Sequence, residues 1–205
     1  MRKWFFFLFL CPSVVLAGEQ WDWSERVQYQ ENHDPSMVWL TDGRKIQVEY
    51  SAIPWQTVDK WPRGNPLLLR YNAESGVVLF DPDSQKALPV LRGLDKHPID
   101  LIVGKCLGQN DSTTGMVDCY GRGHDLWDKE LNRSYKALIE SLGDDQKKKV
   151  KEAQQQWLQF RDAQIAAIGA IYHGREGTLW RIVAAEQFMN VVKEQAQRLY
   201  GFRAW

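Results

Sequence analysis

The sequence has no excess of either charge, because 26 lysines and arginines balance 26 aspartates and glutamates in a chain of 205 residues. Domains that bind DNA or RNA need a basic face that neutralises backbone phosphates. Neither half of the chain carries a strongly basic segment that could form such a face. The charge pattern therefore argues against a nucleic-acid partner.

Long apolar runs are missing after the first 17 residues, so the sequence predicts no membrane span in the rest of the chain. The one apolar run, Trp4–Leu16, follows the basic pair Arg2-Lys3 and precedes Ala17. This arrangement is typical of a secretory signal peptide over residues 1–17, cleaved after Ala17. A lipid anchor at Cys11 is disfavoured, because Leu10 before it is not small. We expect an exported protein, periplasmic or secreted.

Cysteine is scarce, with three residues in the whole chain. Cys11 leaves with the predicted signal peptide, so Cys106 and Cys119 remain in an oxidising compartment, where a pair normally forms a disulfide. A bridge over such a short loop stabilises a protein by roughly 3 kcal/mol. The alternative is two buried thiols. A metal site is disfavoured because no histidine lies at ligand spacing from the cysteines, and no cofactor is predicted.

Catalytic motifs are also missing. The sequence has no Gly-x-Ser-x-Gly, no phosphate-binding Walker loop, no His-Glu-x-x-His and no Gly-x-Gly-x-x-Gly. The four histidines, His33, His97, His124 and His173, are scattered and lie near predicted loops or helix ends. His124 with Asp125 could form a base and its orienting group, but no nucleophile is near them in the sequence. We therefore expect surface or capping histidines and no enzyme activity.

Residues 18–105 predict a small antiparallel β region of four or five strands. Residues 37–50 form a hairpin by their own chemistry, since Asp42-Gly43 favours a type I′ turn between alternating apolar residues. Two further strands are predicted at 66–71 and 77–80. A strand at 87–91 is expected at an edge, because Pro89 lacks the N–H that a ladder needs. Residues 97–105 are expected to be a linker.

Residues 106–205 predict three antiparallel helices. Apolar residues at helical spacing run from 113 to 142, with Gly143 expected as the C-terminal cap. A second pattern begins at Asp144 or Asp145, with Trp157 and Phe160 on its apolar stripe, and a third follows Thr178. The predicted fold class is α+β, a small antiparallel β unit followed by a disulfide-bridged three-helix bundle. Phe202 and Trp205 are expected to pack back on this bundle.

A set of polar side chains recurs on the first two predicted helices: Asp128, Asn132, Gln155, Arg161 and Asp162. An Arg-Asp pair that faces an Asp-Asn pair on a neighbouring helix can hydrogen-bond across a bundle. We expect these residues to form such a structural network. A binding site is the alternative.

The order and spacing of a larger set of residues, which includes this polar set, resemble the pattern of the LprI-type lysozyme inhibitor family over about residues 106–199. The residues that carry the resemblance are Cys106, Thr114, Met116, Cys119, Trp127, Asp128, Leu131, Asn132, Tyr135, Gln155, Trp157, Phe160, Arg161 and Asp162. The resemblance implies an exported, largely helical, cysteine-bridged domain, and the members that give the family its name inhibit lysozyme. The family often has a second cysteine pair on its later helices, whereas here Gln164 stands near one such position. The β region is not explained by the resemblance.

The resemblance and the signal peptide together favour an inhibitor that binds and blocks a lysozyme-like peptidoglycan hydrolase. An immunity protein against a secreted cell-wall-degrading effector and a non-catalytic envelope interaction module are the alternatives. Ten tryptophans suit a binding protein, because Trp often anchors interfaces. An exposed loop would contact the partner, either at residues 121–125 or at 173–177. The candidate contact residues are Arg122, His124, Asp125, His173, Arg175 and Glu176.

Overall fold

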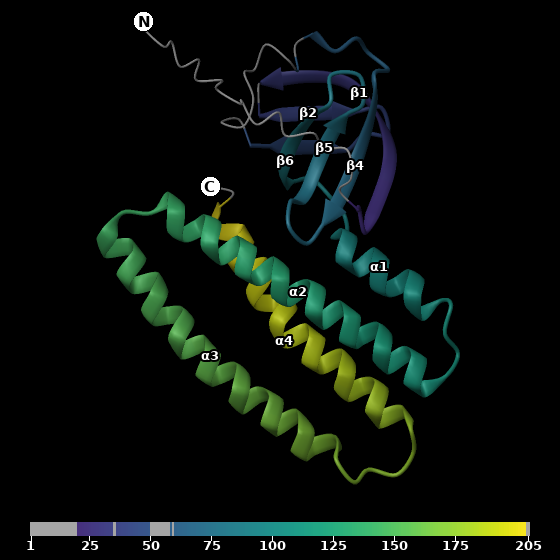
Figure 1. The fold of residues 1–205 in the computed structure, drawn as a ribbon, viewed down its shortest axis with the longest axis vertical. Helices are drawn as coiled ribbons and strands as arrows, with labels where there is room; N and C mark the ends of the chain where they lie inside the picture. The colour runs from purple at the N-terminus through teal and green to yellow at the C-terminus, as the bar shows by residue number, and fades with distance from the viewer. Residues whose placement is uncertain (1–19, 35, 50–57, 59, 204–205) are drawn as a thin grey trace, which may run out of the picture.

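The computed structural model describes all residues except 1–19, 35, 50–57, 59, 204 and 205. The predicted signal peptide, Cys11 and Trp205 therefore lie outside the described residues. The strands are β1 (Trp23–Asp34), β2 (Met37–Leu40), β3 (Lys45–Val48), β4 (Pro66–Asn72), β5 (Gly76–Asp81) and β6 (Lys86–Arg92). The helices are α1 (Pro98–Leu107), α2 (Thr113–Ser141), α3 (Asp144–Tyr172) and α4 (Leu179–Arg203). The α+β class is confirmed, with the strands at one end of the molecule and the helices at the other (Figure 1).

The six strands form a closed antiparallel barrel in the order β1-β2-β3-β6-β5-β4. The predicted antiparallel β region is confirmed, but it has six strands in the described residues, whereas four or five were predicted, and it closes into a barrel. The missing strand is β1, whose many polar residues made it look like a loop or a short strand. The N-terminal half of β1 pairs with β4 and its C-terminal half pairs with β2. The pairing with β2 has a register shift between Tyr29 and Glu31. Closure also removes the expected edge at β6, where the Pro89 carbonyl accepts a hydrogen bond from Glu49 N–H.

The predicted hairpin at β2 and β3 is confirmed, but its turn is not type I′. Gly43 has a φ of 91°, whereas Gln85 is the one described non-glycine residue with a positive φ, so Asp42 does not adopt the required conformation. The Gly43 N–H donates to the Leu40 carbonyl, and the Asp42 carboxylate accepts from Arg44 N–H. This is a type I turn followed by a left-handed glycine, the usual longer hairpin connection.

Residues 97–105, predicted as a linker, contain most of α1. His97 caps this helix, because its Nδ1 accepts from Ile99 N–H, and Pro98 occupies the first turn, where a missing N–H costs nothing. Ile99, Ile102 and Val103 are buried against the rest of the core. The described part of the chain therefore has four helices, so the predicted three-helix bundle is wrong.

Two glycines help to position the long helices. Gly123 lies inside α2, which is continuous, and a Cβ at this position would overlap Met189 and Val103. It is the small residue that lets α1, α2 and α4 approach closely. Gly143, predicted to end the first long helix, is instead the N-cap of α3, with an ordinary φ of −76°. The start of α3 at Asp144 is confirmed.

The helical core is built by α1, α2 and α4, and α3 lies beside them (Figure 1). Met189, Val192, Ala196 and Leu199 of α4 are buried, as the apolar pattern after Thr178 predicts. Leu179, which the same pattern placed on the buried stripe, is 61% exposed. Of the 29 residues of α3, all of them described, only Ile168 is buried.

Three aromatic residues that were expected in the helical core are exposed or only half-buried. Phe160 on α3 is 56% exposed and Trp157 is half-buried. Phe202 is 59% exposed, so it does not pack back on the bundle. The apolar stripe of α3 thus has few partners within the described chain, which makes this helix the natural place to look for a binding surface.

Candidate functional site

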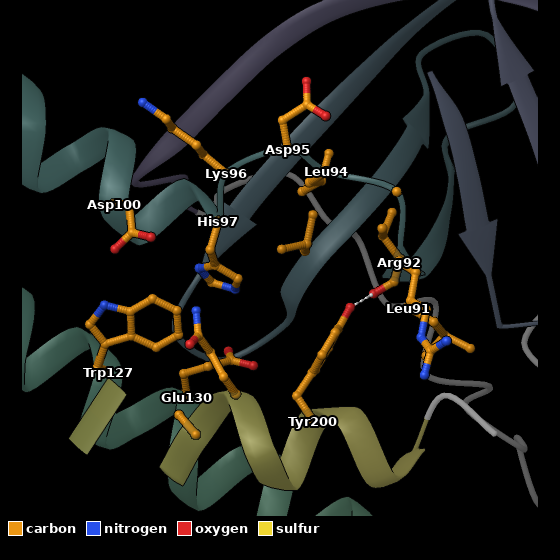
Figure 2. A pocket seen from close by; sticks show the side chains of 15 residues that line it. Leu91, Arg92, Leu94, Asp95, Lys96, His97, Asp100, Trp127, Glu130 and Tyr200 are labelled. Atoms are coloured by element: carbon orange, nitrogen blue, oxygen red, sulfur yellow. Dashed lines mark hydrogen bonds between the residues drawn. The ribbon is translucent and has the colours of Figure 1, made fainter. Parts of the chain in front are cut away.

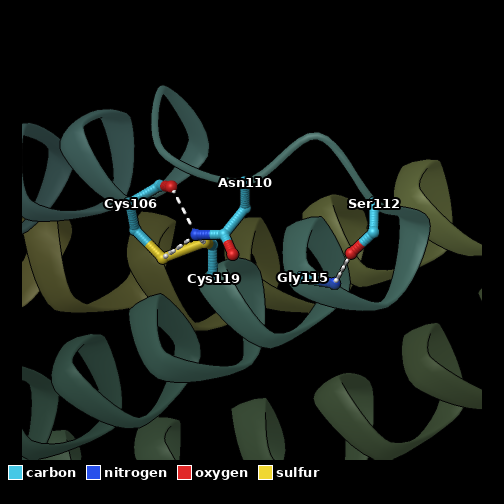
Figure 3. The surroundings of a disulfide bond; sticks show 5 residues. All are labelled: Cys106, Asn110, Ser112, Gly115 and Cys119. Atoms are coloured by element: carbon cyan, nitrogen blue, oxygen red, sulfur yellow. Dashed lines mark hydrogen bonds between the residues drawn. A yellow bond between two sulfur atoms is a disulfide. The ribbon is translucent and has the colours of Figure 1, made fainter.

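A disulfide joins Cys106 at the end of α1 to Cys119 on α2, as predicted, with their Cα atoms 5.7 Å apart (Figure 3). Asn110 supports the connection, because its side-chain amide donates to the Cys106 carbonyl at 2.8 Å. Ser112 then starts α2 by accepting from Gly115 N–H at 3.0 Å. The bridge fixes α1, and with it the barrel, to the longest core helix.

The residues that resemble the LprI pattern divide into two groups by burial. Trp127 and Leu131 are buried in the core, and Tyr135 packs against it. Thr114 is exposed and Met116 is half-buried on the first turns of α2. The others, on α2 and α3, are half-buried or exposed: Asp128, Asn132, Gln155, Trp157, Phe160, Arg161 and Asp162.

The predicted polar network between helices is not present. The Asn132 amide donates to the Asp128 carbonyl and carboxylate within α2, at 2.9 and 3.1 Å. Arg161 donates to the neighbouring Asp162 within α3, at 2.9 Å. In the described part of the chain no hydrogen bond joins these two sets, since each side chain has a partner within its own helix. The helices are therefore not tied together by these residues.

Most of this polar set instead lines an open groove between α2 and α3 of about 330 Å³. Asp128, Asn132 and Tyr135 form one wall, and Gln155, Trp157 and Arg161 are among the residues of the other. A second groove of about 460 Å³ lies between α3 and α4 and includes Trp157 and Phe160. One direct bond crosses there, from the Gln195 amide to Gln154 at 2.9 Å. Hollows thus flank α3 on two sides.

The connection between α3 and α4 is an exposed loop, as predicted, and carries His173, Arg175 and Glu176. Two aromatic rings and one guanidinium group form a cluster at this loop. The rings of Tyr172 and Trp180 are stacked with centroids 5.8 Å apart. The Arg175 guanidinium lies 4.5 Å from the Trp180 ring centroid and 5.5 Å from that of Tyr172. We call Tyr172, Arg175 and Trp180 the hairpin tip.

The other predicted loop, residues 121–125, is not a loop, because it lies inside α2. Arg122 points toward the barrel, with its Nη2 3.9 Å from the Asp22 carboxylate. His124 lies 3.3 Å from the adjacent Asp125 on the helix surface. α2 is continuous here because its core face holds it, so this segment offers no protruding loop to a partner.

A third hollow of about 320 Å³ lies where the barrel meets the helices (Figure 2). Of its lining, Glu130 and Tyr200 were missed by the sequence reasoning. Glu130, 1% exposed, is held by Arg133 and by the Ser134 hydroxyl, which donates at 3.2 Å. Tyr200 on α4 donates to the Val90 carbonyl of β6 at 2.7 Å. The signal for Glu130 was available, because it falls on the buried side of α2 between Trp127 and Leu131.

His97 is the titratable group at this junction. Burial lowers its pKa to about 3, and the nearby Arg133 and Lys193 charges act in the same direction. Its Nδ1 accepts the cap bond, so the neutral ring carries its proton on Nε2, which has no hydrogen-bond partner among the described residues. The capping role expected for the histidines is confirmed at His97.

Within the described residues there is no group of three or more histidine, cysteine, aspartate or glutamate side chains that could hold a metal ion. The described helices also include none with the length and apolarity needed to cross a membrane.

Comparison with known proteins finds a family match in the helical part of the chain. Residues 106–199 match the family described as Lysozyme inhibitor LprI, which confirms the resemblance over this segment. A crystal structure of an uncharacterized protein from Burkholderia thailandensis is similar, with 28% identity and a TM-score of 0.49. The match covers 52% of this chain and 53% of that one, so the chain spans about half the length of its structural relative. A search of curated proteins gave no significant match.

Proposed function

We propose that this protein is an exported inhibitor that binds a lysozyme-like peptidoglycan hydrolase and blocks its cleft. The observation that carries the proposal is the match of residues 106–199 to the lysozyme inhibitor LprI family. The inhibitor acts as a protein ligand and has no catalytic role of its own. Its partner is a muramidase of the cell envelope, and an immunity role against a rival's effector would use the same surface on a different enzyme.

The arrangement of α3 and α4 supports a binding role. Large apolar residues on these helices face solvent: Leu158 is 38% exposed, Ile171 53% and Leu179 61%. Aromatic residues and arginine are enriched at protein interfaces, and exposed apolar surface rimmed by polar groups marks such sites. The hairpin of α3 and α4 is therefore the proposed binding element, carried on the disulfide-bridged core.

Export is part of the same proposal. A signal peptide over residues 1–17 would place the chain in the periplasm or outside the cell, where both a disulfide and a peptidoglycan hydrolase occur. We also propose two units, an N-terminal β region and a helical domain. The helical unit begins with α1 at Pro98, earlier than the predicted boundary at residue 106. The N-terminus of the exported protein, found by mass spectrometry, tests cleavage after Ala17.

Direct binding tests the function. Mature protein from Gly18 onward is mixed with each of several lysozymes and muramidases, and complexes are detected by sedimentation velocity. We expect a one-to-one complex with at least one enzyme at micromolar concentration. A parallel activity assay with a small soluble oligosaccharide substrate separates inhibition of the enzyme from sequestration of peptidoglycan. The proposal is contradicted if no enzyme of the panel binds, and an envelope interaction module is then the better description.

A further inference from the structure

We infer that the hairpin tip is the part that enters the partner's cleft, with the Arg175 guanidinium directed at the carboxylates that line it. This inference rests on the proposed function and names the chemistry of its contact. Glycoside-cleaving sites generally carry a pair of carboxylates, about 5 to 9.5 Å apart, in an open groove shaped for sugar rings. A cation held on flat aromatic rings has the charge and shape to occupy such a groove.

The Arg175 side chain is held in place before any partner arrives. Its Nε donates to the Ile171 carbonyl at 2.9 Å, and its guanidinium lies over the Trp180 ring. Gly174 and Gly177, with φ values of 79° and 93°, supply the left-handed backbone on either side of it. Since the bond uses Nε, the Nη groups are available for a bidentate contact with a carboxylate. A side chain fixed in this way loses little further entropy on binding.

The charge of the tip has no acidic counterpart within reach. Among the described residues no carboxylate lies within ion-pair distance of Arg175, whereas Arg161 on the same helix is paired with Asp162 at 2.8 Å. The adjacent Glu176 is exposed. An unpaired guanidinium on an exposed aromatic platform is suited to an external carboxylate, because a charge-assisted, bidentate bond forms without first breaking an internal one.

The surroundings of the tip resemble the centre of an interface. Tryptophan, tyrosine and arginine are the residue types most enriched among those that carry binding energy, and here they form one cluster. Ile171 and Leu179, 53% and 61% exposed, flank the cluster and offer apolar surface around the charge. Figure 1 shows this connection at the end of the helices farthest from the barrel, where it projects from the molecule.

The test compares two charge reversals on the helical hairpin. Arg175→Glu changes the tip, and Arg161→Glu changes the groove between α2 and α3, where Arg161 lies 5.7 Å from the Trp157 ring centroid. Arg26→Glu is the control, because Arg26 is an exposed arginine on β1 of the barrel, outside the α3–α4 hairpin. Each variant and the wild-type mature protein are titrated against a lysozyme that the wild type inhibits. Thermal unfolding followed by circular dichroism checks that all variants are folded.

We expect Arg175→Glu to raise the inhibition constant at least about 30-fold, a typical effect for a central charged contact. Arg26→Glu should change it less than about threefold. Arg175→Lys should recover part of the loss, because lysine keeps the charge without the planar fork. Tri-N-acetylchitotriose, which fills the cleft, should compete with the wild-type protein for the enzyme.

The possible results separate the two claims. If the wild type inhibits but Arg175→Glu inhibits equally well, the tip is not the contact and the proposed function stands. If Arg161→Glu is the damaging change, the groove between α2 and α3 is the binding surface and the inference is overturned. If chitotriose does not compete, binding occurs outside the cleft, which also overturns it. A wild type that inhibits no enzyme of the panel overturns both the inference and the function.

Discussion

The imidazole of His97 packs against the indole of Trp127 with ring centroids 4.6 Å apart, and this contact joins the two halves of the chain. His97 also meets Tyr71 of β4 edge-on, at 5.5 Å. One side chain therefore caps α1, touches the barrel and covers the core tryptophan of the helical domain. The junction is held by packing as well as by chain connectivity, so the barrel is a fixed base for the helices that carry the proposed binding surface.

Protonation of His97 should destabilise the protein in mild acid. Its pKa, about 3 when folded, lies below the usual value of about 6.5 in an unfolded chain. The unfolded state then binds the extra proton between these two pH values, so this stabilisation is complete above pH 6.5 and is lost as the pH falls toward 3. The free energy of unfolding should fall by up to about 1.4 kcal/mol per pH unit from this group alone.

His97→Asn isolates the effect, because asparagine is a good N-cap and does not titrate. The variant should be less stable at pH 7, having lost the ring contact, and its stability should depend less on pH between 6 and 4. Urea unfolding at several pH values measures both quantities. Equal slopes for the wild type and the variant would show that His97 is not the group that titrates.

Loss of Arg133 should lower the free energy of unfolding more than loss of the Glu130 carboxylate with which it pairs. Glu130 is 1% exposed, and its side-chain charge is compensated by Arg133, which is itself 22% exposed. Removing the cation from a buried pair strands a charge and typically costs about 3 to 5 kcal/mol. Arg133→Met should reach this range in urea unfolding, and adding Glu130→Gln should restore part of the loss. A double variant no more stable than Arg133→Met alone would contradict this account.

Removal of the disulfide should weaken the protein without unfolding it. The bond between Cys106 and Cys119 closes a short loop with a sequence separation of 13. Cys106→Ala with Cys119→Ala should lower the free energy of unfolding by roughly 3 kcal/mol. Guanidinium unfolding of this variant and of the wild type with and without a reducing agent provides the measurement. Reduction should affect only the wild type, and a sensitive variant would point to a different cause.

Substitution of apolar residues should separate the core from the exposed face of α3. Leu131 is 3% exposed, and Leu131→Ala should cost about 2 to 5 kcal/mol because it leaves a cavity. Phe160 is 56% exposed, so Phe160→Ala should change stability by less than about 0.5 kcal/mol. Chemical unfolding of both variants tests the contrast. A large loss at Phe160 would mean that α3 packs more tightly in solution than in this structure.

The elements that sequence patterns predicted well are those in which local chemistry and burial agree. The hairpin of β2 and β3, the start of α3 at Asp144 and the buried stripe of α4 were all foreseen from alternation, capping and helical spacing. The disulfide followed from the number of cysteines and the predicted compartment. Each of these depends on residues close together in the chain or on a choice with few alternatives.

The failures concern long-range pairing and the surroundings of a helix. Barrel closure requires β1 to pair with strands on both of its sides, and the polar residues of β1 carry no local sign of this. The stripe with Trp157 and Phe160 looked like a core face, since an apolar stripe has the same spacing whether the chain or a partner covers it. The α2–α3 polar set was predicted to bond across helices, but nearer partners existed within each helix.

The candidate site could be foreseen in part. The loop that carries Arg175 was predicted, but the stacking of Tyr172 on Trp180 depends on how α3 and α4 come together, which sequence spacing does not encode. The segment with His124 was predicted as an exposed loop and is helical. Glu130 at the junction was missed, although its place between Trp127 and Leu131 put it on the buried side of α2.

The central claim is that the mature protein inhibits a lysozyme-like hydrolase by binding it, and a stoichiometric titration tests this most directly. A fixed micromolar amount of enzyme receives increasing amounts of inhibitor, and residual activity is measured on a soluble oligosaccharide. We predict a decline that reaches completion near one equivalent for a responsive enzyme. Undiminished activity at tenfold excess, across several classes of muramidase, would contradict the claim.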